Sequence, residues 1–182
     1  MSLWRLFRGA APPDAGPAYA VIVAQARQAA FYDGCAVPDS VDGRFDLIAL
    51  HAFLVLRRLK AEGEATAPFR QALFDTMFTD MDRNLREMGA GDLGVGRRVK
   101  AMAKAFYGRI AAYEEGLRDG PAALAAALRR NVYREAAPPD ASVAALAAYV
   151  QAAAARLAAV PADAVQRADF TFGPVARPAS AA

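Results

Sequence analysis

The apolar residues along this chain recur at the three- and four-residue spacing of amphipathic helices, with turn residues between the runs. The spacing predicts helices over 18–29, 43–62, 68–88, 97–119, 122–134 and 141–159, with a glycine-rich break at 89–96. Only residues 169–172 alternate in the manner of a strand. The pattern therefore predicts an all-α fold: a compact multi-helix bundle with an alanine-rich C-terminal helical extension and an irregular tail.

The predicted helix over 43–62 is apolar around most of its circumference. Its two adjacent stripes are Ile48, Ala52, Val55 and Leu59, and Leu47, Leu50 and Leu54. A helix of this kind is buried, so we expect it at the centre of the bundle. The polar residues at 38–42 predict a turn before it that offers several N-caps.

The segments outside the helices set the expected domain organisation. Proline and glycine in residues 11–17 predict a flexible N-terminal segment over 1–17. Residues 18–159 form one predicted helical domain, which suits a chain of 182 residues, and 160–182 are expected to be an irregular C-terminal tail. The single cysteine excludes an internal disulfide and fits a reducing cytoplasm. The first nine residues are too short for a signal peptide.

The segment after the glycine-rich break carries a run of cations that no acid interrupts. The cations are Arg97, Arg98, Lys100, Lys104 and Arg109, and Tyr107 adjoins them. Cations near a helix N-terminus oppose the macrodipole, so this placement does not favour stability. One interpretation is a site for ribosomal RNA, lipid headgroups or acidic side chains, which the formal net charge of +3 permits. The other interpretation is an ordinary solvated face.

Two motifs suggest bound groups, and both are weak. GAGDLG at 89–94 matches a dinucleotide fingerprint, but a methionine-rich helix precedes it where the fingerprint requires a strand. Asp80, Asp82 and Asn84 open like a calcium loop, but Leu85 and Gly91 stand where that loop requires glycine and glutamate. We therefore expect no cofactor and no metal site.

His51 is the only histidine and Cys35 the only cysteine. We expect His51 to be a hydrogen-bonded core or boundary residue, because it lies within the apolar run of the central helix. A catalytic Cys35–His51 pair is the alternative, although neither residue stands in a recognisable nucleophile motif. The sequence thus favours a protein that is not an enzyme and works by holding another protein.

Two smaller groups of residues concern the surface. Ordinary ion pairs are predicted for Asp82 with Arg86 and for Arg83 with Glu87, because each pair is four residues apart on one helix. Trp4 and Phe7 stand beside two arginines, and this short segment is a candidate for contact with a membrane surface.

Four separated strings of residues carry a family resemblance. They are YAVIVAQARQAAFY (19–32), VPDSVDGRFDLIALH (37–51), LFDTMFTDMDRNLREMGAGDLGVGRRVK (73–100) and FYGRIAAY (106–113). In this order they resemble the ubiquinol–cytochrome c chaperone family, which includes mitochondrial assembly factors for the ubiquinol–cytochrome c reductase complex. The resemblance covers about residues 18–120, and the C-terminal third carries little of it.

The resemblance implies a helical, non-enzymatic assembly factor that binds newly made cytochrome b. It also implies the ribosome near its exit tunnel and a small helper protein as partners, with the chain in the cytoplasm and peripheral to the inner membrane of a bacterium. The candidate partner-binding residues are Arg44, Phe45, Asp82, Arg83, Arg86, Arg97, Arg98, Lys100, Lys104, Tyr107 and Arg109. The alternative function is a ribosome- or RNA-binding module that uses the basic face of the fourth predicted helix.

Overall fold

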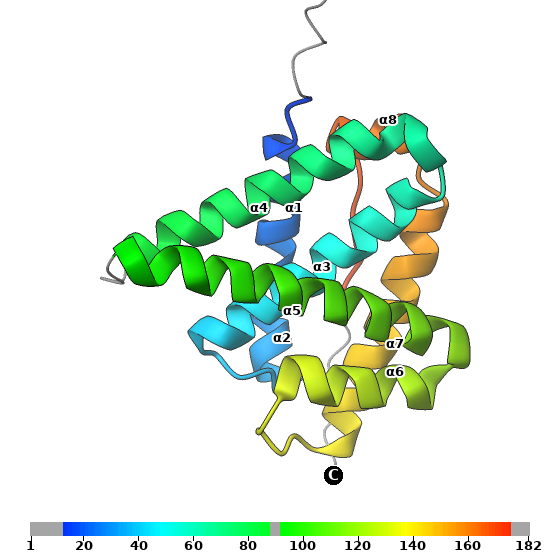
Figure 1. Ribbon diagram of the computed structural model, residues 1–182. Helices are drawn as coiled ribbons and strands as arrows, with labels where there is room; N and C mark the ends of the chain where they lie inside the picture. The colour runs from blue at the N-terminus through cyan, green and yellow to red at the C-terminus, as the bar shows by residue number, and fades with distance from the viewer. Residues whose placement is uncertain (1–12, 88–91, 176–182) are drawn as a thin grey trace, which may run out of the picture.

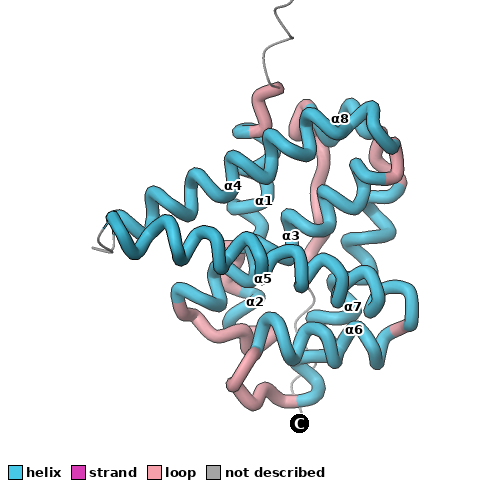
Figure 2. Tube along the Cα trace, viewed as in Figure 1, coloured by secondary structure: helices cyan, strands magenta, loops and turns pink. Residues whose placement is uncertain are grey.

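The computed structural model describes residues 13–87 and 92–175, without the side chains of 92–99. Within these ranges the regular structure is entirely helical, which confirms the predicted fold class (Figures 1 and 2). The elements in chain order are α1 (Gly16–Ala26), α2 (Ala30–Asp33), α3 (Val41–Lys60), the 3-10 turn η2 (Gly63–Thr66), α4 (Ala67–Glu87), α5 (Asp92–Asp119), α6 (Pro121–Leu128), the π-helical turn η3 (Arg129–Tyr133), α7 (Asp140–Ala158) and α8 (Ala162–Gln166). The first helix is shorter than predicted, because α1 ends at Ala26 and a separate short helix follows.

The central helix is α3, as predicted. Thirteen of its 20 residues are buried, and it contacts α1, α4, α5, α7 and α8. Ser40 is its N-cap, since the Ser40 hydroxyl accepts a 3.1 Å hydrogen bond from the amide of Gly43. A Cβ at Gly43 would lie 2.0 Å from the carbonyl oxygen of Pro38, so only glycine fits beneath this turn.

Helices α4 and α5 form a long pair that crosses the front of the molecule in Figure 1. The expected glycine-rich break at 89–96 is wrong from Asp92 onward, because α5 begins there and runs for 28 residues. A glycine costs a helix interior about 1 kcal/mol relative to alanine, which a long packed helix can tolerate. Helix α5 ends before Gly120, whose φ of 103° suits glycine.

The alanine-rich C-terminal third is helical, as predicted, and it is part of the core. Nine residues of α7 are buried, and the helix packs on α3 and α6. The expected irregular tail over 160–182 is wrong for its first part, because α8 forms at Ala162–Gln166. The strand-like residues 169–172 form neither helix nor strand; instead Phe170 and Phe172 are 7% and 2% exposed. Burial of two aromatic rings explains why this segment is fixed against α3.

Helix α7 is also long and apolar enough to cross a membrane, by length and composition alone. Half of its most apolar stretch is buried inside the fold. The buried residues of α7 include Leu146, Val150 and Leu157. The same composition is typical of a core helix in a folded domain, which is the position that α7 has here.

Candidate functional site

An open groove of about 1210 Å³ lies between α2, the first turns of α3, the end of α4 and the middle of α5. Its apolar wall is formed by Tyr32, Val41, Phe45, Ile48, Met81, Leu85 and Met102. Val41, Phe45 and Ile48 recur at four- and three-residue spacing on α3, so one stripe of this helix faces the groove. Val41 is 59% exposed, a high value for a large apolar side chain, and marks the rim.

Four arginines and three acids also line the groove. They are Arg27, Arg44, Arg109 and Arg134, with Asp39, Asp42 and Glu87. Arg44 donates to Asp39 at 2.7 Å, and both side chains are more than half exposed. Such an exposed pair contributes little to stability and opens easily.

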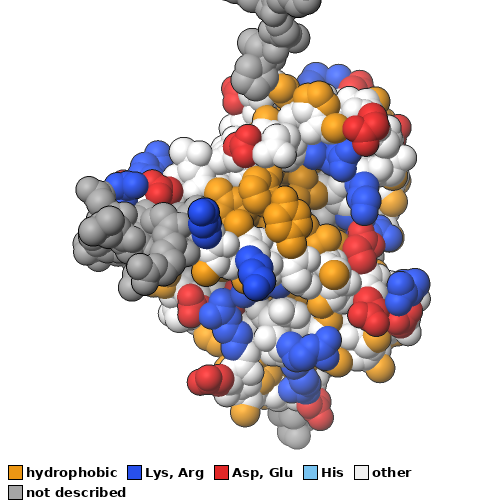
Figure 3. Space-filling model, viewed as in Figure 1, with side chains coloured by type: hydrophobic (Ala, Val, Ile, Leu, Met, Phe, Trp, Pro, Cys, Tyr) orange, Lys and Arg blue, Asp and Glu red, His pale blue; other side chains and the backbone are white. Residues whose placement is uncertain are grey.

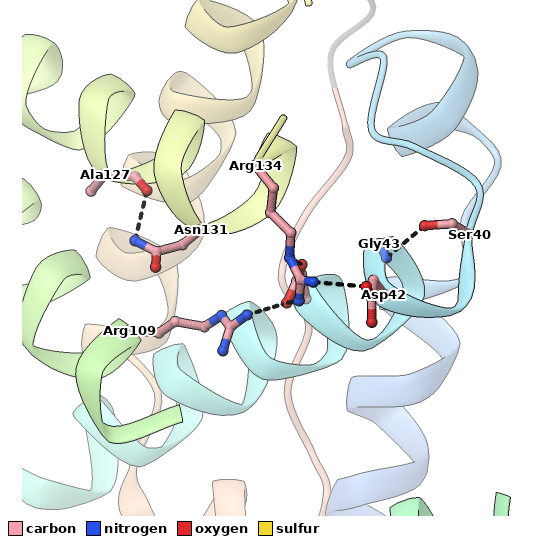
Figure 4. A network of polar contacts seen from close by, with 8 residues as sticks. Ser40, Asp42, Gly43, Arg109, Ala127, Asn131 and Arg134 are labelled. Carbon is pink, nitrogen blue, oxygen red and sulfur yellow. Dashed lines mark hydrogen bonds and ion pairs between the residues drawn. The ribbon is translucent and has the colours of Figure 1, made fainter. Parts of the chain in front are cut away.

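A buried carboxylate, Asp46, joins two of these arginines. Its Oδ1 atom accepts hydrogen bonds from Arg109 at 2.7 Å and from Arg134 at 3.0 Å, and the Asp46 side chain is fully buried. Arg134 also donates to Asp42 at 2.8 Å, so the two arginines and two acids form one network (Figure 4). The network ties α3 to α5 and to the end of η3.

Asp46 and Arg109 form the buried part of this network, and Asp42 forms its exposed part. Burial raises the pKa of the Asp46 carboxyl, while the guanidiniums of Arg134 and Arg109 act in the opposite direction. The Arg109 guanidinium also lies over the ring of Phe45, 5.5 Å from its centroid. Phe45 therefore serves both as groove wall and as support for a buried cation.

Three of the predicted partner-binding residues come together at the groove: Arg44, Phe45 and Arg109. The assignment of Arg109 to a solvated basic face is wrong, because Arg109 is only 7% exposed and is paired with Asp46. The reason is geometric: Arg109 lies on the side of α5 that faces α3, away from the side that carries Lys100 and Lys104.

The other predicted residues lie elsewhere or outside the description. Lys100, Lys104 and Tyr107 are exposed on α5 and do not line the groove. On α4, Asp82 pairs with Arg86 as predicted, whereas Arg83 pairs with Asp80 in place of the expected Glu87. The side chains of Arg97 and Arg98, and all of Trp4 and Phe7, lie outside the described residues.

The exposed tyrosine on α5 belongs to a small aromatic cluster. Tyr107 is 61% exposed and lies 5.6 Å from Phe74 of α4, ring centre to ring centre. Phe74 in turn packs against Phe78 and Phe106. Figure 3 shows apolar side chains gathered over α4 and α5, with Lys and Arg side chains around them.

Sequence reasoning missed Asp46 and Arg134. Asp46 carried a usable signal, since a carboxylate inside an apolar helix that is buried all round requires a cationic partner. Arg134 carried none: it lies 88 residues from Asp46, and its φ of 53° is a conformation that sequence does not predict for arginine.

His51 is a hydrogen-bonded core residue, as expected. It is fully buried, with Nδ1 2.7 Å from the carbonyl oxygen of Leu47 and Nε2 2.7 Å from the hydroxyl of Tyr149. Burial lowers the pKa of His51 to about 4 and raises the pKa of the Cys35 thiol to about 11. Both ring nitrogens are thus engaged elsewhere and the thiol is protonated at neutral pH, so the geometry gives the Cys35–His51 enzyme hypothesis no support. In the described part of the chain, no cluster of three His, Cys, Asp or Glu residues could hold a metal ion.

Comparisons with known proteins agree on one family. Residues 33–172 match the family model described as "Ubiquinol-cytochrome C chaperone". The ubiquinol-cytochrome-c reductase complex assembly factor 1 of Xenopus laevis is 28% identical over 121 residues, which cover 66% of this chain and 60% of that protein. The human protein of the same name is 29% identical over 103 residues, which cover 57% of this chain and 34% of that protein. The matched part of the chain thus spans 60% or less of the length of these relatives.

A solved structure gives the same answer at the level of the fold. The crystal structure of the Cbp3 homolog from Brucella abortus is 40% identical to this chain, with a TM-score of 0.78. The match covers 87% of this chain and 88% of that one. With 140 of its 182 residues inside the family model, the chain belongs to the ubiquinol–cytochrome c chaperone family.

Proposed function

We propose that this protein is an assembly factor for the ubiquinol–cytochrome c reductase complex and that it binds newly made cytochrome b in the groove. The observation that carries the proposal is a wide, largely apolar groove in a chain of this family. The relatives from Xenopus laevis and human are named as assembly factors of that complex, which supports the same role here.

The groove suits a segment of polypeptide better than a small ligand. Its volume of about 1210 Å³ exceeds the roughly 300–1,000 Å³ typical of small-molecule pockets. Met81 and Met102 in its wall have flexible side chains that can adapt to different apolar surfaces. An amphipathic or apolar helix that lies in such a groove is a common mode of protein recognition.

We also propose where in the cell the protein acts and which further partners it binds. We place the chain in the cytoplasm, peripheral to the inner membrane, where it would meet cytochrome b during or after insertion. The ribosome near its exit tunnel and a small helper protein are proposed as further partners on the ground of the family resemblance. These partners would use surfaces other than the groove, which the client occupies.

Deletion of the gene tests the role. The expected result is a lower level of assembled ubiquinol–cytochrome c reductase while cytochrome b message persists. Complementation with Val41→Glu should fail, because a carboxylate at the exposed rim repels an apolar client without disturbing the core. The matched control is Ala148→Glu on the exposed side of α7, which should restore the complex. A normal level of the complex in the deletion strain would contradict the proposal.

A second candidate function, RNA binding, retains one supporting observation. Lys100 and Lys104 are exposed and make no ion pair with any residue in the described part of the chain. Replacing both with glutamate should weaken co-sedimentation with ribosomes. If the two lysines contact phosphates, the salt dependence of binding should weaken by a log–log slope of about 2. Absence of co-sedimentation by the unaltered protein would exclude this function.

A further inference from the structure

Two guanidiniums converge at one place in the wall of the groove. Arg109 and Arg134 both line the groove, and both donate to the same oxygen, Asp46 Oδ1. Two like charges held this close repel one another unless anions compensate them. The charge balance of this site therefore depends on the acidic side chains in the network.

The buried part of the network supplies one negative charge for two positive charges. Asp46 is fully buried and neutralises one guanidinium. The second is balanced by Asp42, whose side chain is 72% exposed and whose ion pair with Arg134 is open to water. An exposed pair of this kind is weak, so another carboxylate can take the place of Asp42 at little cost.

Donor capacity is also left over. The Nε–H group of Arg109 is buried and has no acceptor among the described residues, although Arg109 lines the groove and is more than nine-tenths buried. A buried donor without a partner is costly, and native structures rarely keep one unless a ligand or water completes it. Arg134 is held with φ 53°, a rarely populated conformation for arginine that occurs preferentially at functional sites.

Apolar side chains line the same groove as the two arginines. Phe45, Ile48 and Met102 lie in the same groove, and Phe45 carries the Arg109 guanidinium on its ring. A carboxylate bound here would be partly shielded from water, where its charge-assisted hydrogen bonds to guanidinium are strong. The site therefore selects for an acidic side chain that is flanked by apolar residues.

We propose that Arg109 and Arg134 form a subsite for one Asp or Glu carboxylate of the polypeptide segment held in the groove, with Asp42 displaced when the segment binds. This inference rests on the proposed function, because the segment is taken from cytochrome b. It adds a chemical rule to that function: the recognised segment is apolar except for an acidic residue that meets the two arginines.

The subsite is tested with overlapping peptides that together cover the cytochrome b sequence of the same organism. Binding of each peptide to the full-length protein is measured in mild detergent. Each peptide that binds is made again with its acidic residue changed to the matching amide. The amide version should bind about tenfold more weakly, the order of magnitude expected for a lost charge-assisted hydrogen bond. The Arg134→Gln protein should bind the acidic and amide peptides equally.

Two further variants keep the result interpretable. Arg134→Lys retains the charge but loses the planar guanidinium group, so this variant should show a smaller preference for the acidic peptide. It replaces Arg134→Gln in the test if Arg134→Gln does not fold. Arg167→Gln removes an exposed arginine that pairs with Asp163 outside the groove, and it should leave the preference unchanged. Melting curves of each variant verify that the fold is kept.

The possible failures are distinguishable. Binding that is equal for acidic and amide peptides would overturn the carboxylate subsite and leave the proposed function intact. A preference that persists in both Arg134 variants would also overturn it, because the carboxylate would then be recognised elsewhere. If no cytochrome b peptide binds, the proposed function fails and the subsite fails with it.

Discussion

The guanidinium of Arg109 on α5 donates to the carboxylate of Asp46 on α3 at 2.7 Å, with at most 9% of either side chain exposed. Removing one partner of a buried ion pair leaves an uncompensated charge, which costs about 3–5 kcal/mol. We predict that Arg109→Ala lowers the free energy of unfolding by about 3 kcal/mol, since Arg134 still faces Asp46. Urea denaturation measures the change.

Arg44→Ala is the control for this prediction. Arg44 forms an ion pair at the same groove, but both partners are more than half exposed. Its replacement should leave the urea midpoint nearly unchanged. Similar midpoints for the two variants would contradict the view that Asp46 and Arg109 hold α3 and α5 together.

Most of the fold is predictable from the sequence because helix periodicity is a local signal. The stripes of α3 placed it correctly at the centre, and His51 within them was correctly expected to be buried and hydrogen-bonded. The same local reasoning failed for Arg109, which lies on a different side of α5 from Lys104. Arg109 is buried because it contacts Asp46. It also failed after Val160, because the burial of Phe172 depends on packing against residues such as His51, 121 positions earlier.

The candidate site was predicted in part. Phe45 and Arg44 stand in a recognisable family string and do line the groove. Arg134 could not be found, because its place depends on the positive φ that ends η3 and brings the side chain back to the start of α3. A site built from four separate helices is a property of packing, and a single sequence without structure does not specify it.

The buried histidine predicts a pH dependence of stability. In the folded state burial lowers the pKa of His51 to about 4, against an ordinary value near 6.5. Between these values the unfolded chain binds a proton that the folded chain does not, so stability is full above pH 6.5 and falls as pH decreases towards 4. The loss reaches about 3 kcal/mol at pH 4, at about 1.4 kcal/mol per pKa unit.

The test compares His51→Gln with the unaltered protein across this range. Other titrating groups are common to both chains, so the difference between their urea midpoints isolates the histidine. We expect the unaltered protein to lose stability more steeply between pH 6.5 and 4. Parallel curves would show that His51 titrates normally in the folded state.

Two glycines of α5 give opposite predictions for the same substitution. A Cβ at Gly108 would meet no atom within 4 Å, so Gly108→Ala should raise the free energy of unfolding by about 1 kcal/mol through helix propensity. A Cβ at Gly116 would lie 2.8 Å from the Cα of Leu124 on α6, so Gly116→Ala should destabilise by forcing the two helices apart. Thermal melts of both variants check the pair, and a destabilising Gly108→Ala would contradict the exposed position of that residue.

Phe172, which follows α8 in the chain, is predicted to stabilise the whole fold. Phe172 is 2% exposed, and its ring lies edge-on to His51 at 4.8 Å between centroids. Phe172→Ala should lower the free energy of unfolding by about 3–5 kcal/mol, as for other large-to-small changes in a core. Val41→Ala, at an exposed position, should have little effect. Equal stability of the two variants would mean that the segment after α8 is not part of the core.

The central claim is that newly made cytochrome b occupies the groove. A photo-crosslinking amino acid in place of Val41 reports on the groove rim, and the same amino acid in place of Ala148 reports on the exposed side of α7. After irradiation of cells that are synthesising the complex, we predict a covalent adduct with cytochrome b from position 41 and none from position 148. No adduct from position 41, or equal adducts from both positions, would contradict the account.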